Sequence, residues 1–126
     1  DYLTLQDDRH LSNFALKRNT TTQIESFYPL YDNGRSLFYQ DNEKTIETAW
    51  QNPRLYSTTF GAEGSYYDHI TDILTNDPSA LTLIDLSITD QEIYSIMQTS
   101  GFTGYKLEGI TNWITTAIQT MQALVN

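Results

Sequence analysis

The clearest hydrophobic and polar pattern along the chain predicts a helix over residues 89–100. Thr89 is followed three positions later by Glu92, the spacing of a capping box, in which each side chain accepts a hydrogen bond from the backbone N–H of the other residue. Gly101 can adopt the left-handed conformation that ends a helix, and Phe102 can then fold back over the last turn. The sequence signals for the start, the body and the end of the helix therefore agree with one another.

A second helix is predicted near the C-terminal end of the chain. Its apolar residues recur at the three- and four-residue spacing of one helix face. They are Ile110, Trp113, Ile114, Ala117, Ile118, Met121 and Leu124.

The opposite face of this helix carries only uncharged polar residues after Glu108. Lys and Glu are good helix formers at water-facing positions, so their absence suggests that this face is covered. A second copy of the chain in a homodimer and the N-terminal segment are two possible covers, and a Thr-rich composition is a third explanation. The residues concerned are Thr116, Gln119 and Thr120.

Two more helices follow from local signals. One is expected to start at Ser65, with Asp68 at the capping-box position, and to stop before Pro78. The other is expected over residues 42–51 and is ended by Pro53, because proline cannot continue a helix.

The first forty residues give weaker indications. Apolar residues suggest short helical pieces over 11–15 and 24–28, out of phase with each other. Residues 30–39 contain Asn33-Gly34, the dipeptide that two-residue hairpin turns favour because both central residues need a positive φ. We therefore predict a β-hairpin that turns at Asn33-Gly34.

Residues 81–88 are rich in Leu, Ile and Thr and are predicted to form one further short strand. The preceding Asp77-Pro78 is also a good helix start, so a short helix is the alternative. Together these elements predict an α+β fold, predominantly helical, in a single domain over residues 1–126. Because the chain begins at Asp1 rather than Met, we expect a processed mature chain or an excised domain.

Charge and composition narrow the class of function. The net charge is −9, from 7 basic and 16 acidic residues, so nucleic acid and anionic membrane surfaces would be repelled and nucleic-acid binding is not expected. The chain has no Cys and no apolar run near the ~18 residues of a transmembrane helix. Only 18% of residues are charged, below the ~25% typical of soluble domains, and Thr, Ser, Asn and Gln take their place. This composition favours an extracytoplasmic location, whether periplasmic, secreted or at the cell surface.

Histidine and aspartate give one candidate for catalysis. His69 and Asp72 lie one helical turn apart beside Asp68, and His10 belongs to a second acidic cluster. If folding brought His10, His69, Asp68 and Asp72 together, they could bind a divalent metal ion and support a small metal-assisted hydrolase. The simpler interpretation is that the helix residues of this set are solvated and bind no metal ion. Phosphate-cradling and calcium-binding loops are absent, and no cofactor is predicted.

Aromatic residues give a candidate for ligand binding. Ten of the sixteen aromatic residues lie between positions 27 and 67, interleaved with arginines. Aromatic rings supply flat walls and arginine can clamp a carboxylate, so these residue types suit a small polar ligand. The alternative is that most of these rings pack the core. The predicted site residues are Arg35, Arg54, Trp50, Tyr56 and Tyr39.

These observations favour a non-catalytic extracytoplasmic or surface domain that senses or binds a small polar ligand or another protein. The metal-assisted hydrolase is one alternative. The other alternative is an acidic inhibitory module whose surface would mimic DNA, although the carboxylates are spread thinly along the chain.

Overall fold

Helices form the larger part of the structure, a computed structural model that describes residues 1–57 and 64–126. The α-helices are α1 (Glu43–Thr48), α2 (Tyr66–Asn76), α3 (Asp90–Thr99) and α4 (Gly104–Val125). Short 3₁₀ helices are η1 (Leu11–Asn13), η2 (Ala49–Gln51) and η3 (Pro78–Leu83). Strands β1 (Leu16–Arg18) and β2 (Glu25–Phe27) pair antiparallel. The predicted α+β, mostly helical fold class is confirmed.

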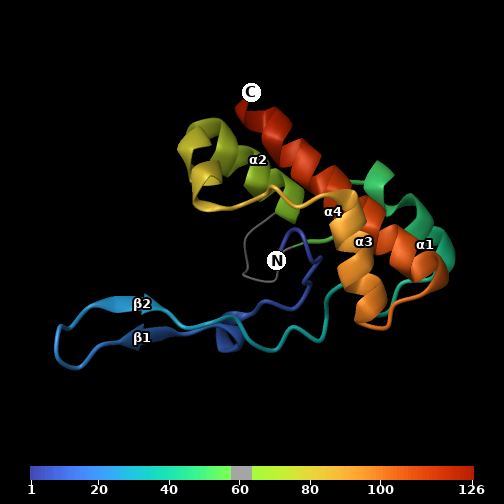
Figure 1. Ribbon diagram of the computed structural model, residues 1–126. Coiled ribbons are helices and arrows are strands. Elements are labelled where there is room, and N and C mark those ends of the chain that lie inside the picture. Colours follow the sequence, from blue (N-terminus) through green and yellow to red (C-terminus); the bar gives the residue numbers. More distant parts are fainter. Residues whose placement is uncertain (58–63) are drawn as a thin grey trace.

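Helix α4 forms the centre of the body, and α1, α2 and α3 pack around it (Figure 1). Its apolar stripe is buried as predicted from Ile110, which is fully enclosed, to Met121, and Leu124 is half-buried. Gly109 lets α1 approach closely, because a Cβ atom at this position would lie 2.1 Å from Cγ2 of Ile46. The helix begins at Gly104, six residues before Ile110, the first residue of the predicted stripe.

Both ends of α3 match the prediction. Thr89 and Glu92 form the reciprocal capping box. At the other end, Gly101 has a φ of 100°, and the Phe102 N–H donates to the Met97 carbonyl over 3.1 Å. This is the hydrogen bond of a Schellman motif, so the end of the helix is confirmed as well.

The predictions for α2 and α1 are also confirmed. Ser65 and Asp68 form a capping box at the start of α2. Asn42 caps α1 through a 3.0 Å hydrogen bond from the Thr45 backbone N–H to its Oδ1 atom, and η2 continues the helical path to Gln51.

The predicted position of the hairpin is wrong. Residues 30–39 contain no strand, and the hairpin is formed by β1 and β2 instead, where residues 24–28 had been predicted to be helical. Asn33-Gly34 does not form the expected turn, because the positive φ values in this segment belong to Asp32, Leu37 and Phe38, and neither Asn33 nor Gly34 has one. The short helix predicted over residues 11–15 is present only as η1.

The further strand predicted over residues 81–88 is also wrong. The Ile84 N–H donates to the Leu81 carbonyl within the end of η3, so the first part of this segment is helical and Pro78 starts it, as in the alternative interpretation. Residues 84–88 are non-helical but have no strand partner. In the described part of the chain, β1 and β2 are the only strands, beside one isolated bridge from Ser57 to Ser65.

The hairpin projects away from the helical body (Figure 1). We refer to residues 14–30, which include both strands and their connection, as the arm. Its β1–β2 register pairs Leu16 with Phe27, Lys17 with Ser26 and Arg18 with Glu25.

Candidate functional site

The two arginines predicted to bind a ligand are each paired with a carboxylate of the chain itself. Arg35 donates from Nε to Oδ1 of Asp7 over 2.8 Å, and its guanidinium lies 5.2 Å from the ring centroid of Tyr39. Arg54 donates from Nε to Oδ1 of Asp68 over 2.7 Å. The charge of each guanidinium is therefore already matched by a carboxylate of the chain.

The two remaining predicted ligand residues differ in exposure. Trp50 is exposed and donates from Nε1 to the Glu47 carbonyl. Tyr56 is half-buried against Phe38, and its hydroxyl oxygen is enclosed without a hydrogen-bond partner among the described residues. Arg35 and Tyr39 are in contact, but no ring contact, ion pair or hydrogen bond of the described residues joins them to the other predicted residues. The small-ligand pocket stays a prediction.

The structure does not bring the four candidate metal ligands together. Within residues 1–57 and 64–126, no group of three or more His, Asp and Glu side chains could hold a metal ion. His10 accepts a hydrogen bond at Nδ1 from the Ser12 backbone, and Asp72 accepts one from Asn76. The ligand set of the hydrolase alternative, which also needs His69 and Asp68, is therefore not assembled.

Asp68 instead holds the start of α2, and this makes the helix sensitive to acid. A hydrogen bond from the Ser65 backbone N–H, followed in importance by the bond from Arg54, lowers the pKa of the Asp68 carboxyl to about 2. Because this folded-state pKa lies below the ordinary value of 3.8, the stabilisation is complete above about pH 4 and is lost as the pH falls toward 2.

We expect Asp68→Asn to lower the melting temperature at neutral pH and to have a smaller effect at acid pH, where the wild-type carboxylate is also protonated. Thermal unfolding followed by circular dichroism at both pH values measures this. Asp72→Asn, on the exposed side of the same helix, is the matched control. An equal loss for Asp68→Asn at both pH values would contradict the assignment.

The uncharged face of α4 is partly covered by the chain itself. Thr116 and Thr120 are half-buried, whereas Gln119 is exposed at a recess between α4 and the segment that precedes α3. A homodimer through this face stays a prediction.

The residue that organises the base of the arm, Arg9, was missed by sequence reasoning. Its side chain is 1% exposed, and Nε and Nη2 both donate to the Asp1 carboxylate over 3.0 Å. Nη1 donates to the carbonyls of Asn13 and Tyr31, which flank the arm, and Nη2 also reaches Oδ1 of Asn33. One buried guanidinium thus ties together the two ends of the arm.

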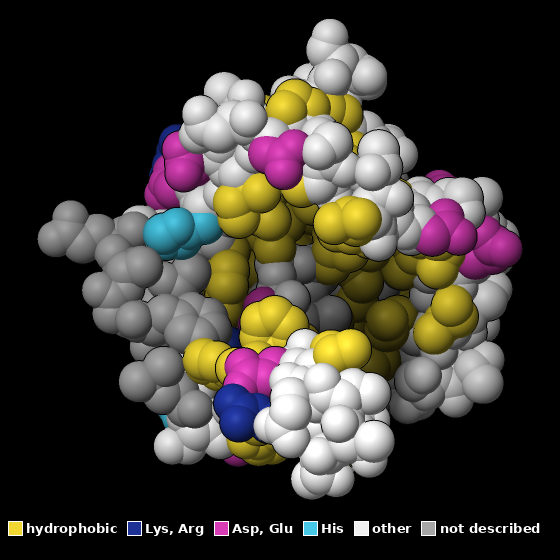
Figure 2. Space-filling view, turned by 90° about the vertical axis from the view of Figure 1, so that its left-hand side faces the viewer, with side chains coloured by type: hydrophobic (Ala, Val, Ile, Leu, Met, Phe, Trp, Pro, Cys, Tyr) yellow, Lys and Arg dark blue, Asp and Glu magenta, His cyan; other side chains and the backbone are white. Residues whose placement is uncertain are grey.

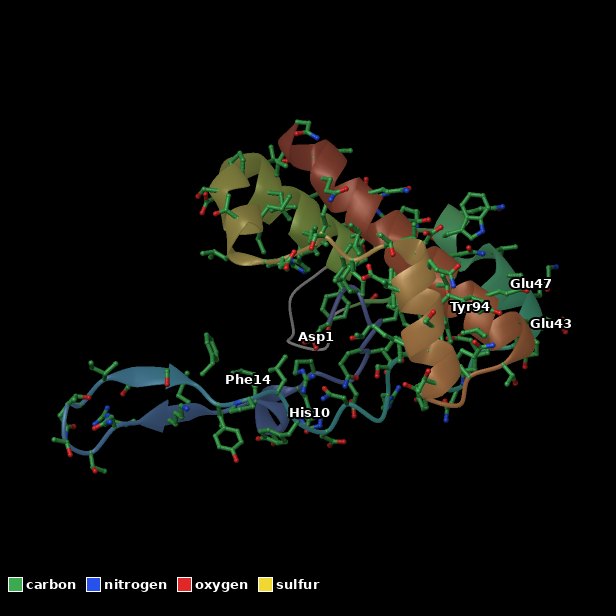
Figure 3. All side chains as sticks on the ribbon, viewed as in Figure 1. Asp1, His10, Phe14, Glu43, Glu47 and Tyr94 are labelled. Atoms are coloured by element: carbon green, nitrogen blue, oxygen red, sulfur yellow. The ribbon has the colours of Figure 1, made fainter. Side chains whose placement is uncertain are left out.

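A second buried polar side chain supports the same junction. Gln6 is fully enclosed, donates from Nε2 to the Asp32 carbonyl and accepts the Asp8 N–H at Oε1, both over 3.0 Å. Figure 3 shows His10 and Phe14 where the arm leaves the body. The base of the arm is therefore fixed by hydrogen bonds that span more than twenty residues of sequence.

The arm itself presents apolar side chains to water. All six strand residues are exposed, and the exposed fraction is 71% for Phe27 and 67% for Ile24. Leu16, opposite Phe27, is exposed as well. Both long edges of the two-stranded ribbon lack a partner strand among the described residues. Exposed apolar strands with free edges are typical of surfaces that bind another chain.

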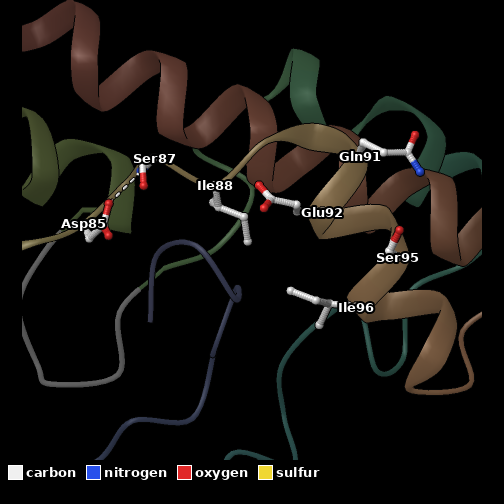
Figure 4. A pocket seen from close by; sticks show the side chains of 7 residues that line it. All are labelled: Asp85, Ser87, Ile88, Gln91, Glu92, Ser95 and Ile96. Atoms are coloured by element: carbon white, nitrogen blue, oxygen red, sulfur yellow. Dashed lines mark hydrogen bonds between the residues drawn. The ribbon is translucent and has the colours of Figure 1, made fainter.

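A groove of about 550 Å³ lies along α3 and the segment before it (Figure 4). Ile88 and Ile96 supply its apolar walls, and Asp85 and Glu92 supply its charge. Hydrogen bonds from Ser87 and from the Thr89 backbone lower the pKa of Asp85 and of Glu92, respectively, so both carboxylates are ionised at neutral pH. The complete lining is Asp85, Ser87, Ile88, Gln91, Glu92, Ser95 and Ile96.

Comparisons with protein-family models, with curated proteins and with solved structures give no match for this chain. Among the described residues, no helix is both long enough and apolar enough to cross a membrane.

Proposed function

We propose that the chain is a non-catalytic interaction domain that binds a protein partner through the arm. The observation that carries this proposal is the exposure of residues 16–30 of the arm, including Phe27, Ile24 and Leu16. Exposed apolar area is unfavourable in water, at roughly 25 cal/mol per Å², and covering it provides binding energy.

The base of the arm supports the proposal as well. Arg9 holds the carbonyls on both sides of the arm, so the arm is presented from a fixed point. A binding element that is already positioned loses less conformational entropy on binding than a flexible segment does. The free edges of β1 and β2 also offer backbone hydrogen bonds to an incoming strand.

The other candidate functions have less support. The hydrolase alternative lacks an assembled ligand set, and the small-ligand hypothesis depends on arginines that already have carboxylate partners.

From the composition, we also propose that the domain acts outside the cytoplasm or at a surface.

Site-specific photocrosslinking tests this function in cells that produce the protein. With a photoreactive benzoylphenylalanine at position 27, we expect a covalent adduct to a polypeptide. The matched control places the same group at Glu47, an exposed residue of α1 at the end of the body away from the arm (Figure 3). Adducts at position 27 but not at position 47 support an arm-mediated interaction. Absence of adducts at position 27 would overturn it.

A further inference from the structure

We infer that the partner of the arm is a second copy of this chain, and that each arm lies in the groove of the other copy. This inference rests on the proposed function of the arm. It adds the identity of the partner and the surface that receives the arm.

The arm and the apolar surface of the body share one side of the molecule. Figure 2 views the protein from the side toward which the arm extends, and the surface above the arm is hollowed, with hydrophobic side chains inside and carboxylates at its margin. In Figure 4, Ile88, Glu92 and Ile96 project from α3 and the segment before it into the groove. Two copies related by a two-fold axis and facing each other could therefore exchange arms. Such an arrangement is closed, and each arm contacts the other copy.

The side chains of the two surfaces are complementary. One face of the arm carries Lys17 beside Ile24 and Ser26, which together line a shallow recess. The groove carries two isoleucine side chains beside two carboxylates, so it is also apolar but has the opposite charge. Ile24 can be buried against Ile88 and Ile96, and the Lys17 ammonium can then meet the Asp85 or Glu92 carboxylate.

The charge distribution along the chain favours the same pairing. Residues 14–30 carry two basic residues and one acidic residue, a net charge of +1. From residue 64 onward there are seven acidic residues and one basic residue, a net charge of −6. The arm is thus a basic segment of an acidic protein, and the body of another copy is a surface of opposite sign.

The arm is not placed to fill its own groove. Arg9 ties Asn13 to Tyr31 at its base, and from there the arm points away from the helices (Figure 1). An exchange between copies brings the Lys17 and Ile24 face of one arm to the groove of the other copy without breaking this junction.

Sedimentation equilibrium of the 126-residue chain tests the inference with charge-reversal variants. We expect a wild-type dimer at micromolar concentration. Lys17→Glu on the arm and Asp85→Lys in the groove should each weaken the dimer by about tenfold or more, as removal of a close charge pair at an interface does. An equimolar mixture of the two variants should associate again, because the altered arm then meets the altered groove. Lys44→Glu, which makes the same charge change on exposed α1, is the matched control and should leave the dimer unchanged.

Circular dichroism verifies that each variant is folded. If Asp85→Lys unfolds the chain, Gln91→Lys places a positive charge in the same groove without removing a hydrogen-bonded carboxylate. A monomeric wild type, an unchanged dimer in the arm and groove variants, or a mixture that fails to reassociate would overturn the inference.

Failure of this inference is distinguishable from failure of the proposed function. A monomer in sedimentation together with a photocrosslink from position 27 to a different polypeptide would leave the interaction domain in place and exclude the second copy as its partner. Absence of a photocrosslink from position 27 would overturn both the proposed function and this inference.

Discussion

Replacement of Arg9 by alanine is expected to lower the free energy of unfolding by about 3–5 kcal/mol, the cost of breaking a buried ion pair by removing one partner. The guanidinium is 1% exposed and makes five hydrogen bonds. Its loss leaves the Asp1 carboxylate without its cation and the carbonyls of Asn13 and Tyr31 without a donor. Urea unfolding followed by circular dichroism measures the change.

Two further variants make this result specific. Arg9→Lys should recover little of the lost stability, because an ammonium group cannot reproduce the planar fork that reaches four residues at once. Arg18→Ala removes an arginine of the arm that forms only an exposed pair with Glu25, and it should have a much smaller effect. If Arg9→Ala lost no more stability than Arg18→Ala, the buried hydrogen-bond network of Arg9 would contribute little to the free energy of unfolding.

The elements that the sequence predicted well have signals within a few residues of each other. For α3, the capping pair Thr89 and Glu92 and the terminating Gly101 all lie within the helix or next to it. The same holds for Ser65 and Asp68 in α2. Such hydrogen bonds form wherever the local sequence permits, so distant contacts did not need to be known.

The hairpin was misplaced because its determinants are distant in sequence. The Asn33 side chain, expected in a tight turn, instead accepts a hydrogen bond from Arg9, 24 residues earlier. Phe27 and Ile24 were assigned to a short helix because apolar residues usually mark a buried face, whereas here they are exposed on the arm. The sequence contains no local signal that distinguishes an exposed apolar arm from a core segment.

The prediction of the candidate site residues was limited by distant contacts in the same way. The sequence identified Arg35 and Arg54 as residues that could clamp an anion, and both do bind carboxylates. However, the partners are Asp7 and Asp68, which lie 28 and 14 residues away in the chain. Residue type therefore predicted the kind of interaction, while the choice between an internal and an external partner depended on the tertiary fold.

Trp113→Ala is expected to lower the free energy of unfolding by about 3–5 kcal/mol, as for other large-to-small changes in a core. Trp113 is 3% exposed on α4, and its ring meets that of Tyr2 edge-on with centroids 5.8 Å apart. Its Nε1 atom lies 3.4 Å from the Tyr2 carbonyl oxygen and donates to it. The substitution leaves a cavity in the core and detaches the N-terminal segment from the helix on which it packs.

Trp50→Ala is the natural comparison for this prediction, since Trp50 is 45% exposed and its replacement leaves no enclosed cavity. Urea unfolding of both variants, followed by circular dichroism, should separate them clearly, with the Trp50 variant close to wild type. Trp113→Phe keeps much of the ring and loses the Nε1 donor, so its stability should fall between those of wild type and Trp113→Ala. If Trp113→Ala unfolded at the same urea concentration as Trp50→Ala, the packing of the N-terminal segment on α4 would not be a major source of stability.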